Sequence, residues 1–156
     1  MTRTPKLSRE VQARLRRSVL RARVSSRERY CPWIVAILAT EDVFRPWTRR
    51  FVEYLAWAIL SVIWPARARL LSVGLAQVQV RHWAGLGKMH SVWPTPANML
   101  TAWSRNENYD VAEAYVRSRL GSAPWTAREI AKHYVGEARA WHVAVLQFCY
   151  DAQQRE

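Results

Sequence analysis

The segment from Trp33 to Ala39 (WIVAILA) limits most strongly what this chain can fold into. It is apolar on every side and follows directly after Pro32. A segment that is apolar all round is stable only when other elements bury it on every side. We therefore expect it to be a central helix, or alternatively a core strand. The chain has 156 residues, which suffices for one domain with a sizeable core around such an element.

Most of the remaining chain predicts helices, so the expected fold class is mainly α, in a single domain. Residues 66–95 hold three of the five glycines and are less periodic. We interpret that region as rich in loops, with a short strand around residues 77–80. Apolar periodicity, prolines and capping residues predict helices elsewhere, over residues 7–24, 46–64, 95–103, 108–120, 126–136 and 137–153.

Individual residues in these helices carry more detailed predictions. Asn108 or Asp110 is expected to cap the N-terminus of the helix that ends before Gly121. Thr126 and Glu129 have the spacing of a capping box, which starts the next helix. In the helix over 46–64, we expect one apolar stripe to face the core; its members are Phe51, Tyr54, Leu55, Ala58 and Val62.

Positive charge is concentrated at the N-terminus. The chain carries a net charge of +12, and residues 1–29 hold ten of the 24 basic side chains against two acidic ones. We therefore divide the chain into a basic amphipathic arm over 1–29 and a helical domain over 30–156. The arginine-rich face of the arm is either a solvated face that packs onto the domain, or a contact surface for a polyanion such as nucleic acid, an anionic membrane or cell wall.

Cysteine and histidine positions give no metal or cofactor site. Cys31 and Cys149 stand far apart and form no cluster with histidine. We interpret both as buried thiols, with one disulfide between them as the alternative if the protein works outside the cytoplasm. The four histidines have no metal-ligand spacing, and phosphate-binding and nucleophile motifs are absent from the sequence. We expect no metal and no cofactor.

Hydropathy predicts neither a membrane span nor standard secretion. The longest apolar run covers residues 54–64 and is shorter than the ~18–20 residues that a bilayer helix needs. The N-terminus has the positive charge of a signal peptide, but no apolar segment follows that charge.

A carboxylate pair, Glu41-Asp42, follows the apolar segment. Burial beside that segment would disfavour the ionised form of Glu41 and raise its pKa, as a general acid requires. Asp42 is a candidate second carboxylate. The alternative is a structural role for the pair, as a helix cap or in ion pairs with Arg45, Arg49 or Arg50.

A second motif, Ser72-x-Gly74-x-x-Gln77, lies about 30 residues further on, and Gln79 follows it. A glycine at its centre allows the backbone to approach a ligand closely. Glutamine side chains are uncharged donors and acceptors, which suit the hydroxyl and amide groups of sugars.

Together with Tyr134-x-Gly136, these motifs resemble the lysozyme-like superfamily, in its lytic transglycosylase and goose-type lysozyme branch. The similarity runs over about residues 33–150. Glu41-Asp42-x-Phe44 is also weakly similar to the peptidoglycan glycosyltransferase family, which shares the same core. The resemblance implies a lysozyme-like helical fold and assigns Glu41 as the catalytic acid/base. It implies a substrate-binding set made of Ser72, Gly74, Gln77, Gln79 and Tyr134.

The activity implied is cleavage of the MurNAc–GlcNAc bond of peptidoglycan glycan strands by a single glutamate. The product is either a 1,6-anhydro sugar, as from a lytic transglycosylase, or a reducing end, as from a muramidase. The expected origin is bacterial or phage, and the site of action the periplasm or cell wall. Four of the nine tryptophans are candidates for stacking on sugar rings, with core packing as the alternative: Trp83, Trp93, Trp103 and Trp125.

The sequence also fits a second class of function. The alternative is a basic helical binding module, with a non-catalytic core, whose helix over 7–24 docks on nucleic acid or an anionic membrane. Binding of that kind weakens steeply with salt.

Overall fold

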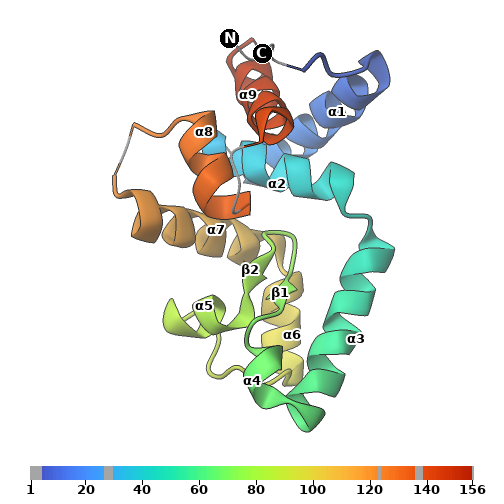
Figure 1. Cartoon of the computed structure of the whole chain (residues 1–156), viewed down its shortest axis with the longest axis vertical. Coiled ribbons are helices and arrows are strands. Elements are labelled where there is room, and N and C mark those ends of the chain that lie inside the picture. The colour runs from blue at the N-terminus through green and yellow to red at the C-terminus, as the bar shows by residue number, and fades with distance from the viewer. Residues whose placement is uncertain (1–4, 27–29, 123, 136–138, 156) are drawn as a thin grey trace. The chain divides into compact units, whose positions relative to one another are not determined.

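The computed structural model describes residues 5–26, 30–122, 124–135 and 139–155. The structure is mainly helical, which confirms the predicted fold class. The elements in chain order (Figure 1) are α1 (Arg9–Ser26), α2 (Pro32–Phe44), α3 (Trp47–Ile63), α4 (Pro65–Ala68), β1 (Ser72–Val73), β2 (Val78–Gln79), α5 (Val80–Gly85), α6 (Pro96–Trp103), α7 (Arg105–Leu120), α8 (Ala127–Ile130), the π-helical turn η1 (Ala131–Val135) and α9 (Ala140–Gln154).

The chain divides into two compact units. The first unit consists of residues 1–43 and 116–156, and the second of residues 44–115. The chain passes from the first unit into the second after Val43, and α7 has residues in both. Each unit has buried residues of its own, so the two are described separately.

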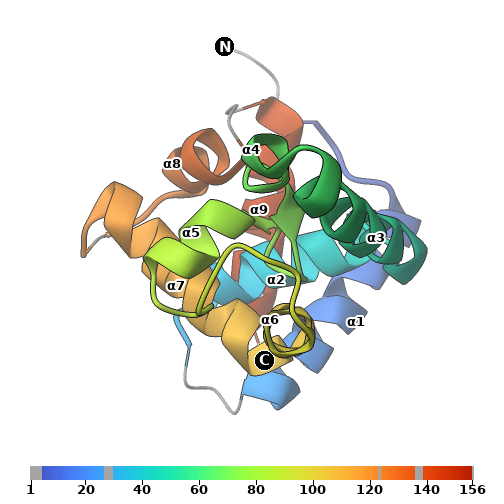
Figure 2. The ribbon, with the colours of Figure 1, turned by 90° about the horizontal axis from the view of Figure 1, so that it is seen from below.

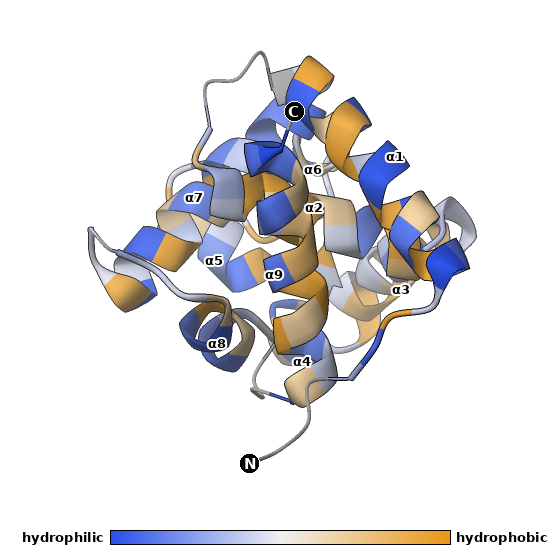
Figure 3. Cartoon of the chain, turned by 90° about the horizontal axis from the view of Figure 1, so that it is seen from above, coloured by the Kyte–Doolittle hydropathy of each residue, from blue (hydrophilic) through white to orange (hydrophobic). Residues whose placement is uncertain are grey.

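In the first unit, α2 is the central element. Every residue from Trp33 to Ala39 is buried, as the uniformly apolar sequence predicts. Helix α1 buries its apolar side, whose members include Leu15 and Val19, while its arginines face outward. Figure 3 shows this alternation along α1 as hydrophobic and hydrophilic colour. The sequence therefore predicted both the buried helix and the amphipathic one correctly.

Polar contacts fix α1 against the C-terminal end of α2. Ser18 Oγ and Arg21 Nη2 each donate to Asp42 Oδ2 at 2.9 Å. Arg14 Nη2 donates to the carbonyl oxygen of Val43 at 3.2 Å. These bonds satisfy groups at the end of the helix, where carbonyls lack partners within the helix.

The second unit is built around a short antiparallel hairpin. Strand β1 pairs with β2 in the register Ser72 to Gln79 and Val73 to Val78. Helix α3 contacts β1 and α5 contacts β2, so the two helices lie on opposite sides of the hairpin (Figures 1 and 2). The predicted strand over 77–80 is thus present as β2, although Val80 already begins α5.

The apolar stripe predicted for α3 is correct only in part. Tyr54 is buried and Ala58 is half-buried, but Phe51, Leu55 and Val62 are exposed, and Trp57 and Ser61 complete the buried face. The polar residues Arg50, Glu53 and Ser61 lie on the same side of α3 as Tyr54 and Trp57, so the most apolar side of the helix is not the one that is buried. The large rings decide the orientation, because burying them removes the most apolar surface from water.

The predictions for the first residues of α7 and α8 have different outcomes. Thr126 and Glu129 form the predicted capping box, with both reciprocal hydrogen bonds present. The prediction that Asn108 or Asp110 caps the preceding helix, α7, is wrong, because α7 begins at Arg105. Asn108 is fully buried within α7, where its amide serves a tertiary contact.

Two further predictions concern the cysteines and the length of the apolar helices. Both cysteines are free; Cys149 is buried as expected, whereas Cys31 is only half-buried because it lies just before the start of α2. Within the described ranges, no helix combines the length and apolar character needed to cross a membrane.

Candidate functional site

Glu41 lies at the rim of a small cavity in the first unit. The cavity has a volume of about 20 Å³, enough for one ordered water molecule. Its walls come from α2, α8, η1 and α9. They are formed by Ile37, Thr40, Glu41, Ile130, Tyr134, His142 and Leu146.

The position of Glu41 follows from the sequence of α2. The helix is buried from Trp33 to Ala39, and Thr40 and Glu41 are the first residues of its C-terminal part to be half-buried. Thr40 Oγ1 donates to the carbonyl oxygen of Ala36 at 2.8 Å and lies 3.8 Å from Cys149 Sγ. The Glu41 side chain therefore stands between an apolar interior and the surface.

The Cys149 thiol behind Thr40 is chemically inert at neutral pH. Burial raises its pKa to about 12, and the hydrogen bond with Thr40 offsets this only in part. A nucleophilic cysteine needs a thiolate at working pH. Cys149 is therefore a core residue.

Tyr134 comes to the cavity on the π-helical turn η1. The predicted motif Tyr134-x-Gly136 ends outside the described residues, because Gly136 is not among them. Tyr134 itself is half-buried and lines the same cavity as Glu41. Single π-helical turns occur often at functional sites, because the extra residue redirects the side chains that follow.

His142 also lines the cavity, and the sequence analysis did not identify it. Its Nδ1 atom is buried without a hydrogen-bond partner among the described residues. Its ring lies 5.3 Å from that of Trp141 in an edge-on arrangement. His142 precedes the buried Leu146 and Cys149 by four and seven residues, and this helical spacing could have placed it on the inner face of α9.

Asp42 has a structural position. Its carboxylate binds Ser18 and Arg21 of α1, in agreement with the alternative of an ion-pair role. The sequence analysis did not name Arg21 as a partner of Asp42. Arg45 and Arg49 pair with Glu53, at 3.0 and 3.7 Å.

In the second unit, Gly74 is required by the fold of the hairpin loop. Its φ of +77° lies in the left-handed region. A Cβ atom at this position would come within 2.5 Å of Asn108 Oδ1 and 2.7 Å of the carbonyl oxygen of Ala102. Asn108 Oδ1 accepts a 2.7 Å hydrogen bond from the backbone N–H of Ala76. The close approach that the motif predicts is therefore to this chain's own backbone and side chains.

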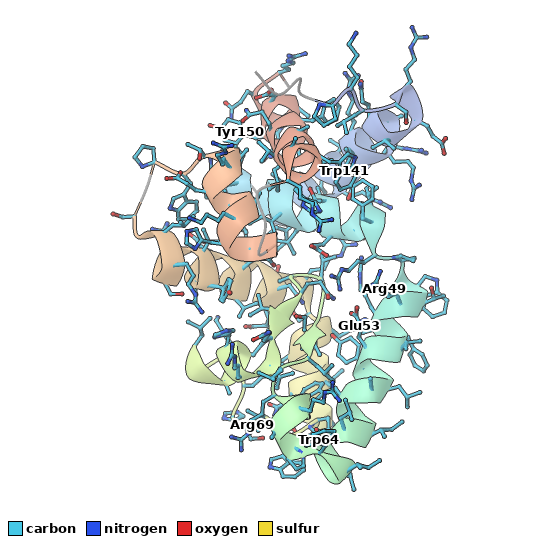
Figure 4. All side chains as sticks on the ribbon, viewed as in Figure 1. Arg49, Glu53, Trp64, Arg69, Trp141 and Tyr150 are labelled. Carbon is cyan, nitrogen blue, oxygen red and sulfur yellow. The ribbon has the colours of Figure 1, made fainter. Side chains whose placement is uncertain are left out.

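Gln77 holds the same loop through its side chain. Its Nε2 donates to Glu53 Oε2 and to the carbonyl oxygen of Gly74, both at 2.8 Å, and its Oε1 accepts from Arg45. Figure 4 shows Glu53 and Arg49 close together on α3. Glu53 is a residue that the sequence analysis missed. It is the sole acidic residue between Asp42 and Glu107, and that isolation could have identified it.

Ser72 and Gln79 stand opposite each other on the hairpin. Cross-strand partners place their side chains on the same face of a sheet. Both residues are half-buried, and Gln79 Oε1 accepts a 2.8 Å hydrogen bond from Arg81 Nε. Of the predicted substrate-binding residues, these two present side chains from the strands themselves.

The tryptophans divide into two classes. Trp83 and Trp125 are buried core residues, so sugar stacking is ruled out for them in this fold. Trp93 and Trp103 are exposed, as stacking requires.

The predicted site residues thus form two groups. Glu41 and Tyr134 line one cavity of the first unit. In the second unit, Gly74 and Gln77 form a connected network with Glu53 and Arg45, and Ser72 and Gln79 are partners across the hairpin. In the ranges that the structure describes, no three His, Cys, Asp or Glu side chains come together as metal ligands.

Comparison of the chain with protein-family models, with curated proteins and with solved structures finds no match.

Proposed function

We propose that this protein is a glycosidase that cleaves peptidoglycan, with Glu41 as its acid/base. The observation that carries the proposal is the position of Glu41 in the last turn of α2, after the buried run from Trp33 to Ala39, where it lines a cavity with Tyr134 and His142. Apolar surroundings favour the protonated form of a carboxyl, which is the form that donates a proton. The lysozyme-like motif order in the sequence supports the same assignment.

The chemistry needs one carboxyl group. Glu41 donates its proton to the glycosidic oxygen between MurNAc and GlcNAc, and the bond from that oxygen to the MurNAc C1 breaks. The N-acetyl oxygen of the sugar supports the positive charge at C1, as in substrate-assisted glycosidases. The Glu41 carboxylate then takes a proton either from the MurNAc 6-hydroxyl, which closes the 1,6-anhydro ring, or from a water molecule that attacks C1.

The hairpin contributes separately, as a glycan-contacting element of the second unit. We assign Ser72 and Gln79 to direct contact with sugar, because both lie on one face of the hairpin. Gly74 and Gln77 act by shaping the loop, since their backbone and side-chain groups are engaged within it.

The test is release of muropeptides from purified sacculi, followed by mass spectrometry. Glu41→Gln removes the donated proton but keeps the shape of the side chain, and we expect a loss of about 10²–10⁴-fold. Glu10→Gln is the control, because it makes the same change at an exposed carboxylate of α1 and should leave the rate unchanged. Equal rates for Glu41→Gln and the wild type would refute the assignment.

A second candidate function is polyanion binding through α1. Arginines at positions 9, 14, 16, 17 and 21 are exposed along the helix. Three of them also contact the fold: Arg14 and Arg21 by hydrogen bonds, and Arg16 by stacking 5.7 Å over the Phe148 ring. The arm cannot simply be deleted, because Leu15 and Val19 are fully buried.

Substitution therefore replaces truncation in the test. Arg9→Gln with Arg17→Gln lowers the charge without touching these contacts. We expect weaker binding to a DNA duplex and a salt dependence with a smaller slope. Unchanged affinity and slope would eliminate this candidate.

A further inference from the structure

A pocket in the second unit combines groups that the proposed mechanism does not use. It has a volume of about 170 Å³ and is formed between the first turns of α3, the hairpin loop and the junction of α6 with α7. This is below the ~300 Å³ at which sites for drug-sized ligands begin, so the space suits about one sugar ring. Its walls are formed by Trp47, Arg50, Tyr54, Gly74, Leu75, Ala102, Trp103 and Arg105.

Tyr54 lines this pocket, and its hydroxyl group is buried without an explained role. Tyr54 is only 5% exposed, and no described residue forms a hydrogen bond with its buried oxygen. Burial raises the pKa of Tyr54 well above its usual value, against the opposing effect of Arg50, so the hydroxyl keeps its proton. A buried hydroxyl without a partner costs stability, and a bound ligand is one way to satisfy it.

Charge and aromatic surface at the pocket point to the class of ligand. The described charged residues in its lining are both arginines, Arg50 and Arg105. Guanidinium groups bind carboxylates with well-defined geometry. Trp47 and Trp103 are both more than half exposed, and indole faces stack on the apolar faces of sugar rings.

We infer that this pocket is a binding site for an acidic sugar, and specifically for the lactyl-bearing MurNAc residue of a glycan strand. The indoles of Trp47 and Trp103 contact the ring, the two guanidinium groups bind the carboxylate, and the Tyr54 hydroxyl bonds to a sugar oxygen. The identity of the sugar rests on the proposed function, whereas the preference for a carboxylate rests on the pocket alone.

Titration of the full-length protein with free MurNAc tests the inference, with GlcNAc and acetate as comparison ligands. The indole N–H signals of Trp47 and Trp103, assigned by Trp→Phe variants, report binding by NMR. We expect MurNAc to shift these two signals at concentrations at least about tenfold below those needed for GlcNAc or acetate. Equal effects of MurNAc and acetate, equal effects of MurNAc and GlcNAc, or no shift of these signals would each overturn it.

Three variants sharpen the result. Arg105→Gln should abolish the preference for MurNAc over GlcNAc, whereas Arg128→Gln, an exposed arginine of α8, should leave it intact. Tyr54→Phe should weaken MurNAc binding several-fold without lowering stability, because the hydroxyl has no internal partner to lose. A destabilised Tyr54→Phe protein with unchanged binding would show that the hydroxyl is structural.

The outcome is separable from that of the proposed function. If the protein digests sacculi but MurNAc does not shift the two indole signals, the proposed MurNAc site is refuted and the assignment of Glu41 stands. Selective MurNAc binding by a protein that cuts no sacculi keeps the pocket and removes the glycosidase.

A different observation, on the opposite side of α3, carries a second proposal independently. Five apolar side chains form a row on the face of α3 that points away from Tyr54 and Trp57, and all five are exposed. This outer apolar row consists of Val52, Leu55, Ile59, Val62 and Ile63.

The surroundings of the outer apolar row are aromatic and basic. Trp64 follows α3 directly and is exposed, and the Arg67 guanidinium lies 5.0 Å from its ring centre. Arg49 lies in the first turn of α3 (Figure 4). The only acidic residue of α3, Glu53, is largely buried in its ion pairs. We propose that this face binds the surface of an anionic membrane, because a tryptophan and arginines beside an apolar row match its interface.

Co-sedimentation with vesicles tests this proposal. The double variant Leu55→Ser with Ile59→Ser should bind vesicles that contain phosphatidylglycerol roughly tenfold or more weakly than the wild type. Leu100→Ser, which changes an exposed leucine of α6, is the matched control and should bind normally. Equal binding of both variants refutes the proposal. A dimer in solution that the double variant dissolves would identify a second copy of the chain as the occupant instead.

Discussion

Helices α2 and α3 are similar in sequence and opposite in environment. A proline lies at the start of each helix, Pro32 in α2 and Pro46 before α3, and both helices are rich in branched apolar residues. Helix α2 buries every residue from Trp33 to Ala39, whereas α3 buries one narrow face and exposes the outer apolar row. Apolar content alone therefore does not report burial. The difference arises from what packs around each helix: α1, α8, η1 and α9 all contribute residues around α2, whereas α3 packs against α4 and β1.

The leucines of the two helices give the largest expected contrast. Leu38 on α2 is 1% exposed and Leu55 on α3 is 51% exposed. Leu38→Ala should lower the free energy of unfolding by about 2–5 kcal/mol, because it leaves a cavity in the core. Leu55→Ala should change it by less than about 0.5 kcal/mol. Urea unfolding measures both, and similar losses would show that α3 is covered as α2 is.

A second contrast compares two glycines with positive φ, Gly74 in the hairpin loop beside α3 and Gly87 after α5. Gly74→Ala should cost at least about 2 kcal/mol, since the new Cβ meets Asn108 and the Ala102 carbonyl. Gly87→Ala is the matched control, with a similar φ of +70° but open space around it, and should cost about 1 kcal/mol. Thermal unfolding separates them. Equal losses would mean that backbone strain, and not the packing of the loop, sets the requirement for glycine.

The two thiols beside α2 give the smallest effect. Cys149 contacts Thr40, and burial raises its pKa to about 12, above the ordinary thiol value of 9.0. The unfolded state therefore releases its proton first as pH rises, so the contribution of Cys149 to stability is complete below pH 9 and is lost between pH 9 and 12. Cys149→Ala should flatten that alkaline decline, whereas Cys31→Ala should not.

Labelling provides the readout for the same pair. In the folded protein at pH 8, iodoacetamide should modify the half-buried Cys31 and leave the buried Cys149 unmodified. In urea it should modify both cysteines. Rapid labelling of Cys149 without denaturant would contradict its burial in α9 against Thr40 of α2.

Local patterns in the sequence determined much of this fold. The buried helix α2, the amphipathic helix α1, the helix that starts after Thr95 and the capping box at Thr126 all follow from residues within one or two turns. From sequence, Gly74 was expected to allow close approach of the backbone to a ligand; the close approach that the structure shows is to Asn108 and Ala102.

Tertiary structure decided what depends on partners distant in the chain. The inner face of α3, the burial of Asn108 and the presence of His142 beside Glu41 were not determined by sequence alone. Helical periodicity fixes which side chains of α3 share a face, but it does not fix which face meets the hairpin. Burial of the large rings of Tyr54 and Trp57 favours the observed face, and the packed neighbours that make it favourable exist only once the chain has folded.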